Sequence, residues 1–253
     1  MTIVDHIYSG SLTSIVGPSG TIRRILKNSS ILKREGIDVS VYNNGIFYKD
    51  WEDREFSAFR PKAMSHKHQL KLKMDVWAKN SRLLSVALME YSRYCRKKTV
   101  KAYLRLKRNA DIVVFHSDLD AFFYFSSISI EKAKTACFFH SDSLPMEMFF
   151  QYYPKLRGTS YARRMVDNYK YVVEKIDRCV FICQKGQENM NNMFPVSIPK
   201  SALVINGIDD ISESQRVESD SIAKERNDNK IKLVSVGSVS LRKGDQSLYL
   251  RKA

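Results

Sequence analysis

The stretch Asp111-Ile-Val-Val-Phe-His-Ser-Asp118 decides the fold class, because the same form recurs as Thr135-Ala-Cys-Phe-Phe-His-Ser-Asp142. Each stretch begins with a short apolar run, which is typical of a strand buried on both faces of a parallel sheet. Each ends in the same tetrapeptide, Phe-His-Ser-Asp. Ligands of doubly wound sheets gather beyond the carboxyl ends of strands, so we expect the two tetrapeptides to line one crevice.

Similar apolar runs alternate with segments of helical periodicity along the chain. This alternation predicts an α/β fold, with a doubly wound parallel sheet of the Rossmann-like kind. The remaining strands are predicted at residues 3–8, 38–42, 179–182 and 203–205. A helix is predicted after the first strand, with apolar positions at Ile22, Ile25, Leu26 and Leu32, and it should end near Gly36.

Two segments between these strands are expected to differ in character. Residues 43–68 lack a clear period, which predicts an irregular connection near the ligand cleft. Residues 77–108 have the length of one or two helices. Their apolar stripe at helical spacing is most simply explained by core packing, and it comprises Leu83, Leu84, Ala87, Leu88, Tyr91 and Tyr94.

Composition limits the partners and the compartment. The chain has 253 residues, 43% of them hydrophobic, and a formal net charge of +15, which favours anionic partners such as nucleotide diphosphates, phospholipid headgroups or nucleic acid. The four cysteines lack the spacing of a zinc module and are expected to be reduced, buried thiols. No apolar run approaches the ~20 residues of a membrane span, and Asp5 and His6 interrupt the position of a signal peptide's apolar segment, so we predict a cytoplasmic protein.

Further motifs stand on either side of the tetrapeptides. Gly17-Pro-Ser-Gly20 precedes the first predicted helix, and Asn206-Gly-Ile-Asp209 follows the last predicted strand of the first domain. A Val-Gly strand and a Lys243-Gly244 turn come next. Together with Phe139-His140, the order of these elements over most of the chain resembles the retaining nucleotide-sugar glycosyltransferases with two Rossmann-like domains, the GT-B fold of glycosyltransferase family 4 (group 1 type).

The resemblance implies a domain organisation. Residues 1–209 would be the acceptor-side domain, residues 210–229 a linker, and residues 230–253 the start of the donor-binding domain. The chain stops nine residues after Gly244, before the segment with two glutamates that binds the donor in the family. We therefore expect a truncated chain that binds a donor poorly alone, and two alternatives remain: an inactive remnant, or a split enzyme completed by a complementary C-terminal chain.

The resemblance also assigns site residues. His140 would face the donor sugar as the catalytic-site histidine, although a structural hydrogen-bonding role is the simpler alternative. The donor-binding set is Gly17, Gly20, Arg242, Lys243 and Gly244. The ammonium of Lys243 would stabilise the departing diphosphate, and Arg242 would replace an arginine that the family often has where Ser238 stands here.

Other readings of the same residues are weaker. His116 and Asp142 rank below His140, and the glycines also suit an ordinary strand-to-helix turn because a full G-x-G-x-x-G is absent. A metal site or a hydrolase triad is rejected, since no compact ligand cluster and no identifiable base support either. The resemblance implies no metal and no cofactor, with the nucleotide-sugar as co-substrate.

Residues 93–108 form a basic segment with interspersed aromatic residues. Such a helix can lie on anionic lipid, which predicts peripheral contact with the inner face of the membrane through Arg96, Lys97, Lys98, Lys101 and Arg105. A solvated helix face is the plainer alternative. Nucleic-acid binding is a lesser one, because no recognised binding module accompanies the segment.

Taken with the resemblance, these features predict a hexosyltransferase-type enzyme of polysaccharide biosynthesis. It would move a sugar from a nucleotide diphosphate to a cell-surface glycan or a lipid-linked acceptor, with retention at the anomeric carbon. Positioning and stabilisation of phosphate charge would carry the catalysis.

Overall fold

The computed structural model describes residues 1–12, 18–51, 77–128 and 133–204. By its contacts the chain divides into two units, Met1–Asn206 and Gly207–Ala253, and every described residue belongs to the first. Gly17 and the donor-binding residues Arg242, Lys243 and Gly244 lie outside the described residues. The linker and the second domain lie outside them too, so the domain boundaries stay a prediction.

The described residues form a mixed α/β fold around one seven-stranded sheet, with the order β3-β2-β1-β4-β5-β6-β7. Its strands are β1 (Thr2–Ile7), β2 (Ile37–Asn43), β3 (Ile46–Tyr48), β4 (Ile112–Phe115), β5 (Lys134–Phe139), β6 (Arg178–Phe181) and β7 (Ser201–Leu203). Every neighbouring pair is parallel except β2 and β3. The arrangement is consistent with a Rossmann-like fold. Each of the six predicted strands overlaps an observed one, although β7 begins and ends two residues before the predicted 203–205.

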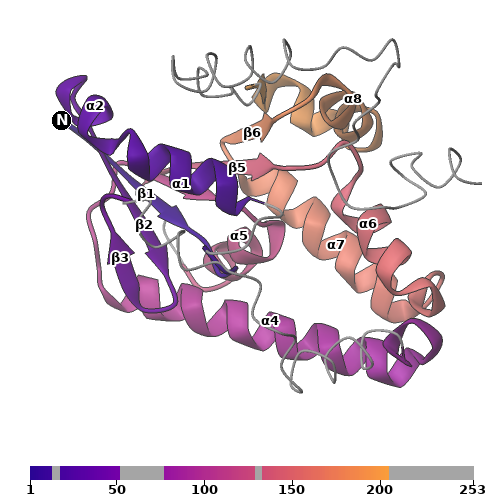
Figure 1. The fold of residues 1–253 in the computed structure, drawn as a ribbon. Helices are drawn as coiled ribbons and strands as arrows, with labels where there is room; N and C mark the ends of the chain where they lie inside the picture. Colours follow the sequence, from indigo (N-terminus) through magenta and orange to yellow (C-terminus); the bar gives the residue numbers. More distant parts are fainter. Residues whose placement is uncertain (13–17, 52–76, 129–132, 205–253) are drawn as a thin grey trace, which may run out of the picture. The chain divides into compact units, whose positions relative to one another are not determined.

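Helices cover both faces of this sheet (Figure 1). They are α1 (Ser19–Lys27), α2 (Ser29–Arg34), α4 (Arg82–Arg105), α5 (Asp118–Phe125), α6 (Pro145–Tyr152), α7 (Ser160–Lys175) and α8 (Gln184–Met193), with short 3₁₀ turns at Pro154–Leu156 and Pro195–Lys200. On one face, Ile22 and Leu26 of α1 pack against Val41. On the other, Phe115 and Phe139 pack in a larger cluster with residues of α5 and α7.

The inner strand β1 carries a buried, ionised side chain on the sheet face that is covered by the larger core. Asp5 is fully buried and accepts hydrogen bonds from Ser40 Oγ (2.6 Å) and Tyr103 Oη (2.8 Å). Arg108 completes the arrangement with two more, from Nε (2.8 Å) and Nη2 (3.1 Å), and its guanidinium lies 4.5 Å from the centre of the Phe47 ring. A buried carboxylate is tolerable only when it is paired and hydrogen-bonded, so these contacts fix β1 relative to β2 and α4.

A hairpin begins where the sequence predicted an irregular connection. β2 turns into β3 through Asn44 (φ 48°) and Gly45 (φ 98°), both in the left-handed region that Asn-Gly pairs favour in two-residue hairpins. The prediction for residues 43–68 is therefore wrong at its start, because the Asn-Gly turn outweighs the poor periodicity that follows. Residues 52–76 lie outside the described part of the chain.

The apolar stripe of α4 is also misassigned, because much of it faces solvent: Leu83 is 85% exposed and Tyr91 is 68% exposed. The buried residues of this helix are Ser85, Thr99, Val100 and Tyr103. The face toward α5 is filled partly by Arg93, whose guanidinium lies over the rings of Phe122 and Phe123 while its long stem is covered. Helical periodicity identified the helix but not its buried side.

Two further expectations concern thiols and membrane spans. Cys137 and Cys179 are buried as predicted, whereas Cys183 is half-buried and Cys95 is exposed on α4. None of the helices in the described ranges has both the length and the apolar composition needed to cross a bilayer.

We expect Asp5→Ala to destabilise the protein by about 3 kcal/mol, because it leaves the partly buried guanidinium of Arg108 without its partner. Ser40→Ala removes only one neutral donor to the same carboxylate and should cost about 1 kcal/mol. Urea unfolding followed by circular dichroism measures both. An Asp5→Ala variant no less stable than Ser40→Ala would contradict a central role for the ion pair.

Candidate functional site

The candidate site lies where the carboxyl ends of β1, β4 and β5 meet. β1 pairs with β2 on one side and with β4 on the other, so the chain winds in opposite directions from this point. Crevices at such switch points are the usual ligand sites of open α/β sheets. A cavity of about 300 Å³ is present here, and its polar lining includes Tyr8, Arg96, His116, Asp118, His140 and Ser141.

Three histidines form a hydrogen-bonded row across these strand ends. His6 of β1 shares a hydrogen bond with His116, which follows β4, and His116 shares another with His140, which follows β5. Each nitrogen-to-nitrogen distance is 2.9 Å. At both steps the rings stack with centroids 5.2 Å apart and planes 24° from parallel. Parallel register produces this row, because the three side chains project from one face of adjacent strands.

Burial keeps the row neutral. It lowers the pKa of His6 to about 4, an effect that nearby Asp5 partly offsets. Burial lowers the pKa of His116 well below its usual value, and the two neighbouring histidines act in the same direction. Burial also lowers the pKa of His140 to about 4. Neutral imidazoles can both donate and accept hydrogen bonds, which suits hydroxyl-bearing or phosphorylated ligands.

A buried carboxylate, that of Asp120, positions the guanidinium of Arg96 at the same cavity. Asp120 of α5 is fully buried and accepts hydrogen bonds from Ser9 Oγ (2.5 Å) and from Nη1 of Arg96 (3.4 Å). Burial raises the pKa of Asp120, and the charge of Arg96 opposes that shift. Because the Arg96 side chain keeps 26% of its exposure and lines the cavity, it can also meet an anionic group of a ligand.

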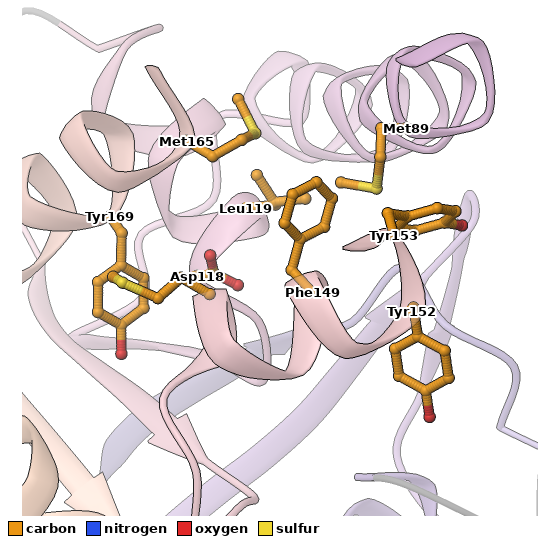
Figure 2. Close-up of a pocket in the computed structure, with 9 residues that line it drawn as sticks. Met89, Asp118, Leu119, Phe149, Tyr152, Tyr153, Met165 and Tyr169 are labelled. Atoms are coloured by element: carbon orange, nitrogen blue, oxygen red, sulfur yellow. The ribbon is translucent and has the colours of Figure 1, made fainter. Parts of the chain in front are cut away.

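A second, apolar pocket of about 230 Å³ lies beside the first and shares Asp118 with it. Figure 2 shows Phe149 of α6 between Met89 of α4 and Met165 of α7, with the Asp118 carboxylate on the side toward Tyr169. Burial raises the pKa of Asp118, although the charge of Arg96 opposes the rise. One carboxyl therefore stands between a polar cavity and an apolar one.

The structure brings together only some of the residues that the sequence singled out. His140, His116 and Arg96 line one cavity. Asp142 is not among the described residues that line this cavity. Its carboxylate accepts a hydrogen bond from Ser143 Oγ (3.2 Å). Gly20 lies in the first turn of α1, where an added Cβ would meet no atom within 4 Å. Pro18, two positions earlier, lines the cavity instead.

The five basic residues of α4 that were predicted to contact the membrane separate into two groups. Lys97, Lys98, Lys101 and Arg105 are exposed on the helix, whereas Arg96 turns toward Asp120. Arg96 therefore differs in position from the other four residues of the predicted membrane contact.

Sequence reasoning missed several residues of the site. His6 was considered only as a break in an apolar segment, although its place in a buried strand next to Asp5 marks it as a polar group that needs a partner. Arg96 could have been separated from the exposed lysines, because it lies four and seven positions before the buried Val100 and Tyr103. Gly10 was also missed, and a Cβ there would collide with the Tyr8 ring.

Two further findings bear on identity. No three His, Cys, Asp or Glu side chains within the described ranges converge as metal ligands would. The chain matches no protein-family model and no curated protein sequence.

The lowered histidine pKa values predict a loss of stability in acid. The unfolded chain takes up protons near pH 6.5 while the folded rings stay neutral to about pH 4, so stability is full above pH 6.5 and falls as the pH drops toward 4. We expect each ring with a pKa of about 4 to contribute a loss of roughly 2 kcal/mol between pH 7 and pH 5, measured by urea unfolding.

His140→Gln provides the control for this pH dependence. The raised pKa values of Asp118 and Asp120 act in the opposite sense, but the substitution retains both carboxyls. The variant should therefore lose less stability than the parent over the same pH range. Equal losses of stability in the two proteins would show that His140 does not contribute to the pH dependence.

Proposed function

We propose that this protein is a glycosyltransferase that moves a sugar from a nucleotide-diphosphate donor to a hydroxyl-bearing acceptor. The observation that carries the proposal is the cavity at the switch point, whose lining combines neutral imidazoles with a partly exposed guanidinium. Imidazole nitrogens suit sugar hydroxyls, and guanidinium suits phosphate oxygens. The order of sequence motifs that resembles retaining glycosyltransferases supports the same class, with Lys243 and Arg242 at the donor diphosphate.

The apolar pocket favours an acceptor with an apolar portion over a purely polar glycan. Its lining is aromatic and methionine-rich, and methionine side chains adapt to irregular apolar groups. Because Asp118 also lines the polar cavity, an acceptor could place its hydroxyl near His140 and its apolar part against Phe149. A lipid-linked acceptor has both parts.

The exposed face of α4 supports contact with an anionic membrane that carries such an acceptor. Lys98, Lys101 and Arg105 follow one another along this face, and Tyr91 and Tyr94 continue it toward the start of the helix. Basic residues interact with anionic headgroups, while tyrosines suit the boundary between water and lipid.

Calorimetric titration with a panel of nucleoside diphosphates and nucleotide-sugars tests donor binding by the full chain. We expect saturable binding to one nucleotide class, at least about tenfold weaker in Lys243→Ala, because the ammonium would neutralise diphosphate charge. Lys252→Ala, which removes the same charge nine positions later in the chain, should bind like the parent. No binding across the panel by a folded sample would overturn the donor assignment.

Vesicle co-sedimentation tests the membrane contact. The triple variant Lys98→Glu, Lys101→Glu, Arg105→Glu should lose about 3 kcal/mol or more of affinity for vesicles containing anionic lipid, at about 1 kcal/mol per basic residue. The matched control reverses Lys27, Lys33 and Arg34, which are exposed on α1 and α2, to glutamate with the same change in net charge. Equal losses in both variants would indicate attraction by net charge rather than docking through α4.

A further inference from the structure

Each hydrogen bond in the row of histidines joins Nδ1 of one ring to Nε2 of the next. Nδ1 of His6 lies 2.9 Å from Nε2 of His116, and Nδ1 of His116 lies 2.9 Å from Nε2 of His140. The same nitrogen thus faces the same way at both steps. The ring of Phe138 stacks beside the row, 5.4 Å from His116 and 5.9 Å from His140 between centroids, without a hydrogen bond to either.

This pattern couples the tautomers of the three rings. A neutral imidazole carries one proton, so it donates through one nitrogen and accepts through the other. If His116 donates from Nδ1, then it accepts at Nε2 from Nδ1 of His6, and the proton of His140 must be on Nδ1. If His116 donates from Nε2, all three protons are on Nε2. Either way, all three rings share one tautomer.

We propose that His6 and His116 are positioning residues that set, through this row, which ring nitrogen of His140 carries its proton. His6 is 5% exposed and His116 is 4% exposed, so water offers little alternative to the bonds within the row. The lowered pKa values keep the rings neutral near pH 7, which is the condition for one proton per ring. Nδ1 of His140 has no hydrogen-bond partner among the described residues, so it remains for a ligand in the cavity.

The two states give His140 different roles toward a ligand. With all protons on Nδ1, His140 donates a hydrogen bond to a ligand oxygen. With all protons on Nε2, it accepts one from a hydroxyl group. The buried histidines of the row thereby determine whether His140 donates a hydrogen bond to a ligand or accepts one from it.

The second state also provides a path for a proton, and this step rests on the proposed acceptor hydroxyl. The O–H bond breaks and an N–H bond forms at Nδ1 of His140. Its Nε2 proton passes to Nδ1 of His116, and the Nε2 proton of His116 passes to Nδ1 of His6. The oxygen keeps its electron pair, and the positive charge ends on His6, where the charge of Asp5 on the opposite face of the strand partly offsets the cost of burial.

Long-range ¹H–¹⁵N NMR of the histidine rings in the full chain tests the coupling without any ligand. The chain has five histidines, and the other two, His66 and His68, serve as internal references. At pH 7.5 we expect His6, His116 and His140 to share one single tautomer. Different tautomers within the row, or rapid averaging at His140, would overturn the proposal.

Two variants of His116 separate coupling from simple packing. His116→Phe keeps a ring but removes the nitrogen that bonds to His140, so His140 should lose its single tautomer and give averaged ring-nitrogen shifts. His116→Asn supplies a polar atom close to the place of Nδ1 and should restore the single tautomer. Phe138→Leu alters the stacking alone and should leave the tautomer unchanged. An unchanged His140 spectrum in a folded His116→Phe variant would refute the inference.

Because the spectra are recorded without substrate, their outcome is independent of sugar transfer. Coupled tautomers in a chain that binds no nucleotide would leave this inference standing and count against the proposed function. Uncoupled tautomers in an active enzyme would do the reverse.

Discussion

Two consecutive polar residues of β1, an inner strand of the sheet, constrain the whole structure. Successive side chains of a strand point to opposite faces, so Asp5 and His6 enter the two separate layers that cover the sheet. Each needs a partner, because burial of an unpaired polar group costs free energy. Asp5 finds Arg108, Tyr103 and Ser40, while His6 finds His116. The position of β1 against β2, β4 and α4 is thereby fixed from both sides.

The candidate site follows from the same alternation. A polar residue just beyond each neighbouring strand points to the same face as His6, and parallel register brings the three rings within hydrogen-bond distance. The repeated Phe-His-Ser-Asp tetrapeptide therefore has a geometric role in each copy. Its phenylalanine enters the larger core, and its histidine turns to the other face at the cavity. One short motif supplies both packing and chemistry.

Sequence reasoning predicted the strands well, because buried parallel strands appear as short apolar runs with clear ends. It also predicted that each of the two tetrapeptides ends a strand. It could not assign the buried side of α4, where Arg93 occupies a place usually taken by an apolar residue and Tyr91 stays exposed. Nor could it identify His6 or Asp120 as parts of the site, because their roles depend on partners more than a hundred positions away in the chain.

The strand order also has a consequence for the growing polypeptide. One edge of β1 can pair with β2 soon after both strands have been synthesised. The other edge pairs with β4, which comes much later in the chain. The backbone N–H of Ile3, for example, donates to the Asp111 carboxylate 108 positions further on. Until β4 is synthesised, this edge of β1, the strand that carries the buried Asp5, stays unpaired. Such long-range pairing slows folding and exposes edges to other chains. During synthesis, β1 thus keeps one edge open to pairing with other chains until β4 has been made.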